Sequence, residues 1–431
     1  MPGSERRPDR CVRDADVVLL GGGGAGIAVL HHLALHLLRQ QHRRPLRVVV
    51  VDPLDRLVHR PSDRTWCSWL PRGGPSEAVL APAVHRWWDT VHLVAADGTD
   101  VPLDLAPLRY VMVRGEDYYA HVAEVVGRAQ ASGSLQLEHA AELAEGVEEH
   151  DDGVRVILPR AALRTRTLLD SRPAPPSRPG ASSLVQEFLG RRFRLPGAGI
   201  DADRAVLMDF SVPQPDVGLA FGYCLPTDSA SVLVEHTAFV PRSLGQVHHA
   251  AALDAYLPRA LGTTASADLR VEHEETGTIP MTDAPFPQRP PAPPGARRSR
   301  VVKLGTAGGA VRPSTGYAFS AMQRAARALA GQLAAGVPGD RLDLPRPYPR
   351  RHAWMDALLL RALLDGPRRG GIDGPEFFVR LFTSNPPQRV LRFLDGLTCP
   401  TEELALMATS PRGPMLRAAA ADAAWRLGVG R

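Results

Sequence analysis

The chain has 431 residues and a mass of 46.5 kDa, a length that suits two or three packed domains rather than one small module. Hydrophobic residues make up 44% of it and charged residues 23%, and this ordinary globular composition excludes wholesale disorder. The net charge is +5, and the arginines are spread among acidic residues instead of gathering on one element, which argues against nucleic-acid binding.

The apolar runs and the cysteines exclude further classes of protein. The sequence has no apolar run of about 18 residues or more, so no membrane-spanning helix is expected. Its four cysteines form no CxxC pair, which excludes a zinc ribbon or a disulfide framework and indicates a cytoplasmic protein. No metal site is expected.

A strand, a glycine-rich turn and a helix come first along the chain. Residues 16–20, which are apolar after Asp16, predict the strand, residues 25–41 predict the helix, and residues 47–51 predict a second strand that ends at Asp52. Apolar strands separated by a helix are typical of a parallel sheet. We therefore predict an α/β fold of the Rossmann type, with helices on both faces of the sheet.

The first turn matches a nucleotide-binding pattern. Gly21, Gly23 and Gly26 complete G-x-G-x-x-G, with Ala25 beside the last glycine. The glycines allow a tight turn, close approach of a pyrophosphate and packing of the helix on the strand, while Asp52 can accept hydrogen bonds from a ribose. A purely structural glycine turn is the alternative, but the order of strand, loop, helix, strand and acid favours a dinucleotide site.

The middle of the chain has a different pattern, with short strands that indicate an antiparallel region. They are expected at residues 154–158, 204–210, 219–225 and 231–239. A Pro- and Ser-rich loop at residues 171–183 separates the first of these strands from the other three, and a second such break at residues 285–299 follows the last.

A second glycine turn follows the strand predicted at residues 300–304. Gly305, Gly309, Pro313 and Gly316 shape it, and a helix is expected at residues 321–335. Because the ribityl chain and ring of FAD extend away from the first phosphate loop, a second turn favours FAD over NAD. An ordinary strand–helix connection is the alternative.

These patterns divide the chain into five segments. They are a first part of the FAD-binding domain at 14–110, its continuation at 111–170, an inserted antiparallel substrate domain at 171–290, the second glycine turn and its helix at 300–340, and a helical C-terminal region at 341–431.

Several segments, in order, resemble bacterial lycopene β-cyclases, the FAD-dependent carotenoid cyclases. The segments that carry the likeness are Asp16 to Gly26, Arg64-Thr-Trp-Cys67, Met208-Asp-Phe210 with Leu233-Val-Glu-His-Thr237, Glu274 to Thr282, and Arg312-Pro-Ser-Thr-Gly-Tyr-Ala-Phe319.

The resemblance implies a reaction without net redox change. The ψ ends of lycopene would close to β-ionone rings, giving γ-carotene and then β-carotene, with reduced FAD required and NAD(P)H serving as its reductant. The partner would be lycopene or a related apolar carotene, met at a membrane surface by a cytoplasmic, peripherally associated enzyme. The alternatives are an FAD-dependent monooxygenase or polyprenyl reductase on the same fold, and a carotenoid-binding flavoprotein without catalysis.

Two acids are the candidate catalytic residues. Glu235 aligns with the essential acid of the family, and burial in an apolar tunnel would keep it protonated, although a solvent-facing glutamate is the alternative. Asp209 is either a proton-sharing partner or an acid at a strand end. Glu274 and Glu275 point to opposite faces of a strand, so at most one reaches the site, and we assign them structural or positional roles. His236 is expected to pack away from Glu235.

The signature Arg64, Thr65 and Trp66 is expected to contact the flavin, with Trp66 beside the ring. Thr306 stands where many FAD hydroxylases have an aspartate, which counts against a hydroxylase, and Arg312 replaces a histidine expected in the family.

Two aromatic pairs, Trp87 with Trp88 and Tyr118 with Tyr119, line a polyene channel or fill a core. The apolar segment 352–364 is a buried helix or a membrane contact.

Overall fold

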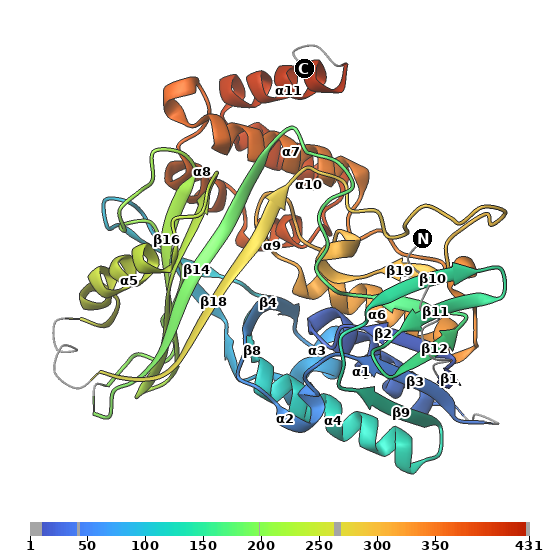
Figure 1. The fold of residues 1–431 in the computed structure, drawn as a ribbon. Helices are drawn as coiled ribbons and strands as arrows, with labels where there is room; N and C mark the ends of the chain where they lie inside the picture. The colour runs from blue at the N-terminus through green and yellow to red at the C-terminus, as the bar shows by residue number, and fades with distance from the viewer. Residues whose placement is uncertain (1–10, 41–43, 198, 263–268, 428–431) are drawn as a thin grey trace, which may run out of the picture.

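A five-stranded parallel sheet forms the base of the molecule. The computed structural model describes residues 11–40, 44–197, 199–262 and 269–427. Every neighbouring pair in the sheet is parallel, as predicted for the apolar runs at residues 16–20 and 47–51 (Figure 1). The strand order is β19 (Val301–Lys303), β13 (Leu168–Asp170), β2 (Val17–Leu20), β3 (Leu46–Val51) and β9 (Leu135–Ala140).

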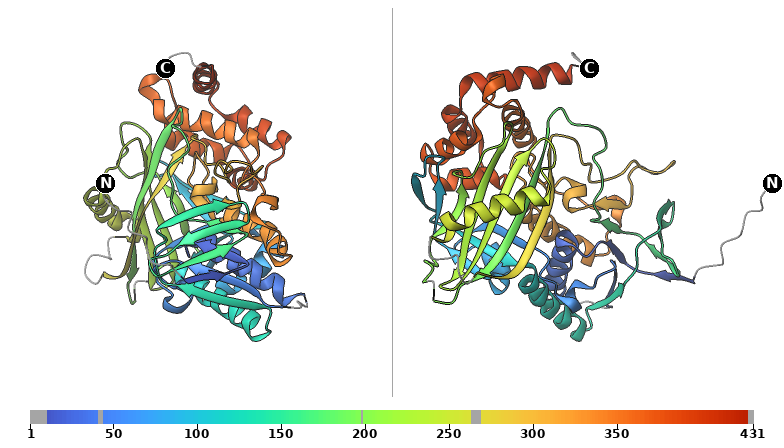
Figure 2. Two further views of the ribbon diagram at one scale, coloured as in Figure 1. Left: turned by 45° about the vertical axis from the view of Figure 1, so that its right-hand side comes forward. Right: turned by 60° about the vertical axis from the view of Figure 1, so that its left-hand side comes forward.

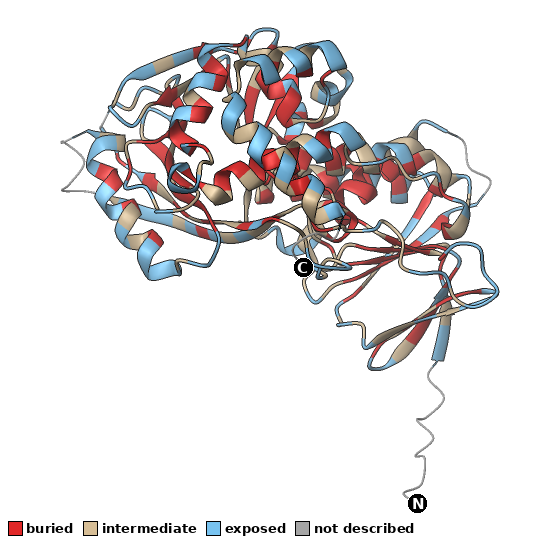
Figure 3. Cartoon of the chain, turned by 90° about the horizontal axis from the view of Figure 1, so that it is seen from above, coloured by how far each residue is buried: buried red, intermediate tan, exposed pale blue. Residues whose placement is uncertain are grey.

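Helices cover one face of this sheet. They are α1 (Gly24–Leu38), α4 (Gly115–Ala131) and α6 (Phe319–Ala334), which bury Val17 and Leu19 with their own apolar sides. Figure 3 shows helices that are buried on one side and exposed on the other, as expected for amphipathic helices. The first helix was predicted to reach Gln41, which lies outside the described residues; α1 ends at Leu38.

The prediction of helices on both faces was wrong for the second face. Val18 and Leu20, which alternate with Val17 and Leu19, pack instead against a four-stranded sheet. That sheet has the order β1 (Cys11–Asp14), β12 (Ala161–Thr165), β11 (Gly153–Ile157) and β10 (Gly146–His150). The strand predicted at residues 154–158 belongs to this sheet.

A seven-stranded sheet forms the second body of the molecule (Figures 1 and 2). Its neighbours are antiparallel except for one parallel pair, β15 with β6. The order is β18 (Arg270–Thr282), β14 (Ser183–Arg194), β17 (Ser231–Val240), β16 (Leu219–Asp228), β15 (Ala205–Asp209), β6 (Thr90–Val94) and β7 (Asp100–Asp104). The last two strands of this order, β6 and β7, come from the segment 14–110 that was assigned to the FAD-binding domain, so this assignment needs correction.

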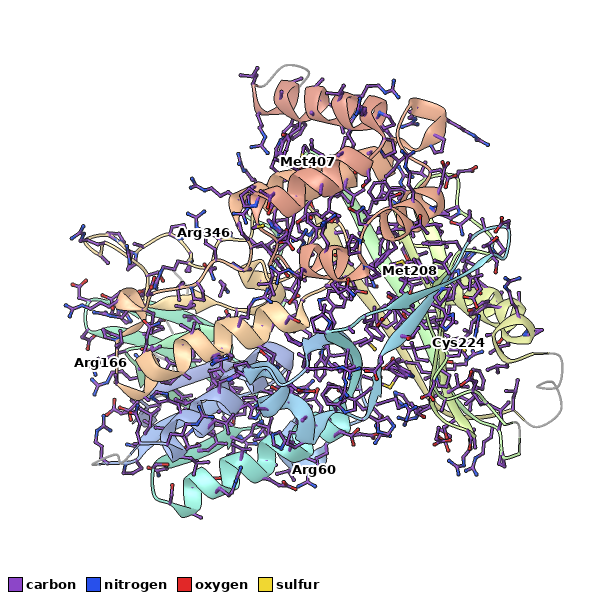
Figure 4. All side chains as sticks on the ribbon, turned by 180° about the vertical axis from the view of Figure 1, so that it is seen from behind. Arg60, Arg166, Met208, Cys224, Arg346 and Met407 are labelled. Carbon is purple, nitrogen blue, oxygen red and sulfur yellow. The ribbon has the colours of Figure 1, made fainter. Side chains whose placement is uncertain are left out.

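Different layers cover the two faces of the seven-stranded sheet. Helix α5 (Gln246–Leu261) packs on one face. The opposite face packs on C-terminal helices and on a three-stranded antiparallel sheet of β4 (Thr65–Pro71), β8 (Leu108–Arg114) and β5 (Arg86–Trp88). Figure 4 labels Met208 and Cys224, which pack on opposite faces of the seven-stranded sheet.

The C-terminal region is helical, as predicted. It contains α7 (Arg350–Asp365), α8 (Gly374–Thr383), α9 (Pro387–Leu394), α10 (Pro400–Thr409) and α11 (Arg412–Arg426), drawn in red in Figure 1. The apolar segment 352–364 lies in α7, and its leucines Leu358, Leu359, Leu360 and Leu363 are buried. Within the described ranges, no helix has the length and apolarity needed to cross a membrane.

Candidate active site

A cavity of about 620 Å³ lies where the two bodies meet. Its wall includes the first and second glycine turns at one end and the face of the seven-stranded sheet at the other. Ten predicted site residues line it: Gly21, Gly23, Ala25, Asp52, Arg64, Thr65, Trp66, Glu235, Gly305 and Gly316. Four predicted site residues are not part of its lining: Gly26, Gly309, Pro313 and Asp209.

The first glycine turn leaves backbone donors open toward the cavity. Gly21 has a φ of 93°, which favours glycine, and a β-carbon on Gly26 would lie 2.2 Å from the carbonyl oxygen of Gly21. Gly26 therefore allows α1 to pack against the turn. At Gly23, the N-cap, no described atom lies within 4 Å of the position of a β-carbon, and no side chain caps the helix. The free N–H groups of the first helical turn are a site for an anion.

Asp52 connects the second strand to this turn. Its Oδ2 accepts a hydrogen bond from the backbone N–H of Gly22 at 2.7 Å, and its Oδ1 accepts from Leu54 N at 2.9 Å and from Arg56 at 3.1 Å. A carboxylate has about four acceptor sites, so one remains for a further donor.

The segment Arg64-Thr-Trp-Cys67, which runs from just before β4 into its first residues, lines the cavity. The indole of Trp66 stacks on Phe319, with 5.4 Å between ring centroids, and the guanidinium of Arg64 lies 5.8 Å from the Trp66 ring. Trp66 is thus held by packing while one side of it faces the cavity.

Two positive-φ glycines of the second turn line the cavity. Gly305 has a φ of 59° and Gly316 a φ of 74°, and a β-carbon on Gly316 would lie 1.9 Å from Gln186 Oε1. Gly309 lies behind them, where a β-carbon would approach Phe286 O at 3.3 Å. Pro313 and Gly309 thus shape the turn without reaching the cavity.

A buried ion pair fixes the second turn to the C-terminal helices. The guanidinium of Arg312 is fully buried, donates to Asp356 Oδ1 at 2.6 Å and lies 2.9 Å from His352 Nδ1. It also lies 5.0 Å from the ring of Tyr348 and 4.9 Å from that of Phe393. The arginine at this position therefore anchors the turn and does not face the cavity.

Glu235 lies on the cavity side of β17. Its Oε1 accepts a hydrogen bond from Thr237 Oγ1 at 2.5 Å. Burial raises the pKa of Glu235 to about 8, because the carboxylate loses its hydration, and the negative charge of Glu275 contributes in the same direction. The carboxyl is therefore mainly neutral at pH 7.

Glu275 was given a structural or positional role, and the structure places it in the cavity wall. It is buried, and burial also raises its pKa. Glu274, which directly precedes Glu275 on β18, points away from the cavity and accepts a hydrogen bond from Arg191 Nε at 2.8 Å. One of the two glutamates reaches the site, as the alternation of a strand predicts.

Asp209 lies on the opposite face of the seven-stranded sheet, so a direct catalytic role is wrong. It accepts hydrogen bonds from Tyr256 Oη at 3.2 Å, Arg259 Nε at 3.3 Å and Ser211 Oγ at 2.6 Å. A separate cavity of about 220 Å³ adjoins it under α5. His236 packs on this face too, with its Nδ1 2.9 Å from His249 Nδ1, as expected.

The two aromatic pairs belong to cores. Trp88, Tyr118 and Tyr119 are buried, Trp87 packs against the same core as the two tyrosines, and none of the four is part of the cavity lining.

The apolar part of the cavity wall was not predicted from the sequence. The sheet and the second turn supply Phe188, Tyr223, Leu225, Leu233, Ile279 and Tyr317. Alternation along β16 and β17 could have identified Tyr223, Leu225 and Leu233, which share a face with Glu235. Two further lining atoms, Gln186 Oε1 and Thr315 Oγ1, are buried without a hydrogen-bond partner among the described residues, which suits a ligand.

The fold matches solved flavoprotein structures. A flavoprotein/dehydrogenase from Cytophaga hutchinsonii superposes with a TM-score of 0.60 at 12% identity, covering 96% of this chain and 100% of that chain. A geranylgeranyl bacteriochlorophyll reductase-like protein from Thermoplasma acidophilum gives 0.55 at 12% identity, covering 92% and 96%. The p-nitrophenol 4-monooxygenase of Pseudomonas putida gives 0.57 at 16% identity, covering 92% and 98%. The chain thus has the fold of FAD-dependent monooxygenases and reductases.

No curated protein matches the sequence. The family model described as "Lycopene cyclase protein" matches residues 16–420, which is nearly the whole chain and includes both glycine turns and both cavity glutamates. The chain belongs to the lycopene cyclase protein family.

Proposed function

We propose that this protein is a lycopene β-cyclase that closes the ψ ends of lycopene, or of a related carotene, to β-ionone rings with reduced FAD bound in the cavity. The observation that carries the proposal is the position of the Glu235 carboxyl, whose pKa burial raises to about 8, in the apolar wall of the same cavity that the two glycine turns line. Family membership supports the reaction class.

The residues at the glycine end fit FAD. The free N–H groups at the start of α1 suit the pyrophosphate, and the remaining acceptor site of Asp52 suits a ribose hydroxyl. Gly305 and Gly316 let the second turn line the cavity, and the unpartnered Gln186 Oε1 and Thr315 Oγ1 can bind polar atoms of the cofactor. When bound, the reduced flavin supplies negative charge close to a developing carbocation, and we propose NAD(P)H as its reductant.

The sheet end of the cavity fits the end of a polyene. Phe188, Leu225, Leu233 and Ile279 supply apolar surface, and they exclude water from the carboxyl of Glu235. Exclusion of water is required because water would otherwise capture the carbocation that protonation of an alkene produces.

Glu235 acts as both acid and base in the proposed reaction. Its carboxyl donates a proton to the terminal double bond, and the neighbouring double bond attacks the resulting cation to form the ring. The carboxylate then removes a proton from a ring carbon, so the acid is restored and the product is an isomer of the substrate. Repetition at the other end would convert γ-carotene to β-carotene.

We further propose that the enzyme works in the cytoplasm at a membrane surface, where an apolar carotene is available. The charge distribution supports this: residues 341–431 contain 14 arginines and 9 acidic residues, so this region accounts for the whole net charge of +5. Positive charge favours contact with anionic lipid headgroups.

The product in lycopene-accumulating bacteria tests the proposal against its alternatives. We expect cells that express the chain to convert lycopene to ring-containing pigments of the same mass, as identified by chromatography and mass spectrometry. A product that has gained two hydrogens would indicate a reductase, a product that has gained oxygen would indicate a monooxygenase, and unchanged lycopene bound to purified protein would indicate a carrier. Each of these three results would contradict the proposal.

A further inference from the structure

One row of residues crosses the seven-stranded sheet on its cavity side. In the middle of the row, Gly190 on β14 is paired with Glu235 on β17 and with Glu275 on β18, while Tyr223 on β16 extends the row beyond Glu235. Paired residues of adjacent strands point to the same face, so the two glutamates are neighbours across a single glycine.

Gly190 provides the space that the two acidic side chains occupy. A β-carbon on Gly190 would lie 3.2 Å from Glu235 Oε2 and 3.4 Å from both Glu235 Cβ and Glu275 Cγ. A β-carbon at this position would therefore crowd the Glu235 carboxyl and touch Glu275, whereas glycine leaves this space to the two acids.

The surroundings of the two acids differ. Burial raises the pKa of Glu275, and Thr65, Arg192 and Arg64 act against that rise by favouring its ionised form, whereas no described cation forms an ion pair with Glu235. The other titratable groups that face Glu235 come from β4, β16 and the second glycine turn: Cys67, Tyr223 and Tyr317. Burial raises their pKa values further above neutrality, so they are neutral at pH 7. The charge that acts on Glu235 is therefore that of Glu275.

We propose that Glu275 is a positioning residue whose ionised carboxylate, held beside Glu235 across Gly190, keeps the reactive proton on Glu235. The inference rests on the proposed function, since it assigns a partner to the proposed acid. The two carboxyls together hold one proton before the reaction and none after the alkene is protonated. They regain one when the ring carbon loses its proton, so the pair returns to its initial state.

The pH dependence of the Glu275→Gln variant tests this inference. Removal of the negative charge is expected to lower the pKa of Glu235 by about 1 unit, so the alkaline limb of the rate profile moves down by about 1 unit. The rate then stays close to the unsubstituted rate near pH 6 and falls about tenfold below it near pH 9. An unshifted limb, or an equal loss of rate at every pH, would overturn the inference.

A second measurement works without substrate. In infrared difference spectra recorded against Glu235→Gln, the band of the protonated Glu235 carboxyl should disappear at a lower pH in Glu275→Gln than in the unsubstituted protein. Glu274→Gln is the matched control, because that exposed neighbour pairs with Arg191, and it should leave the titration unchanged.

The Glu275→Asp variant covers the case in which Glu275→Gln does not fold. It restores a carboxylate and should bring the titration back toward that of the unsubstituted protein. If Glu235 titrates identically with Glu, Asp or Gln at position 275, the inference is wrong even if lycopene is cyclised. If the titration shifts as expected but no ring forms from lycopene, the proposed function fails and the acid pair stands.

Discussion

The two faces of the seven-stranded sheet give their acidic side chains different hydrogen-bond donors and different neighbouring charges. On the face under α5, Asp209 receives hydrogen bonds from Arg259, Tyr256 and Ser211. On the cavity face, Glu235 receives one from the hydroxyl of Thr237, and its nearest charge is that of another carboxylate, Glu275.

This difference in donors and neighbouring charges shows how one sheet can hold both a structural acid, Asp209, and a reactive acid, Glu235. A charge-assisted hydrogen bond from Arg259 and three neutral ones from Tyr256 and Ser211 fix the geometry of the Asp209 carboxyl. A carboxyl with a single hydroxyl donor in an apolar wall stays protonated, and it is therefore an acid at neutral pH. The number and charge of the donors, rather than burial alone, separate the two roles.

Substitution of Glu235, the reactive acid, is expected to have the largest effect, and this effect is on the rate of cyclisation. In Glu235→Gln, the amide has nearly the shape of a neutral carboxyl but cannot donate its proton to an alkene, so we expect the rate of cyclisation to fall by about 10²–10⁴-fold. Purified enzyme assayed with lycopene in vesicles gives the rate, and titration with FAD gives the cofactor affinity, which should not change. A rate within threefold of the unsubstituted enzyme would remove Glu235 from the chemistry.

The next effect is on stability as a function of pH. The pKa of Glu235 is about 8 in the fold and near 4.5 in the unfolded chain. Its stabilising contribution is therefore complete below about pH 4.5 and is lost as the pH rises to about 8. Relative to Glu235→Gln, the unsubstituted protein should lose about 4 kcal/mol of unfolding free energy over this interval. Denaturant unfolding at both pH values measures it, and parallel curves for the two proteins would contradict the assigned pKa.

The smallest effect concerns the face under α5. In Asp209→Asn, an amide N–H₂ meets the donors Arg259 and Tyr256, so we expect a loss of about 1–3 kcal/mol in stability. The rate of cyclisation at a temperature where the variant is folded should stay within about twofold. A lost rate with an unchanged melting temperature would place Asp209 in the reaction after all.

Local features of the site could be predicted from the sequence. The turn of Gly21, Gly23 and Gly26 with Asp52 depends on neighbouring residues and on one strand–helix–strand unit, and its elements lie as expected. The orientation of Glu235 away from His236 follows from alternation along one strand.

Features that depend on pairing between distant strands could not be predicted. Glu275 meets Glu235 through the register of β14 with both β17 and β18, which the sequence does not reveal. Regular alternation from Val206 would place Asp209 on the cavity face, but a bulge between Val206 and Met208 turns it to the other face. Likewise, the segment with β10, β11 and β12 covers a sheet face where the strand pattern alone predicted helices.

A single turnover in D₂O tests most directly whether a carboxyl donates a proton to the alkene. The enzyme, reduced and equilibrated in D₂O, is mixed in excess with lycopene, and the product is analysed by mass spectrometry and NMR. We expect one deuterium per ring, located on the carbon that was protonated, and no such product from Glu235→Gln. Rings without deuterium, or a product carrying hydrogen from the reductant, would contradict proton donation by Glu235.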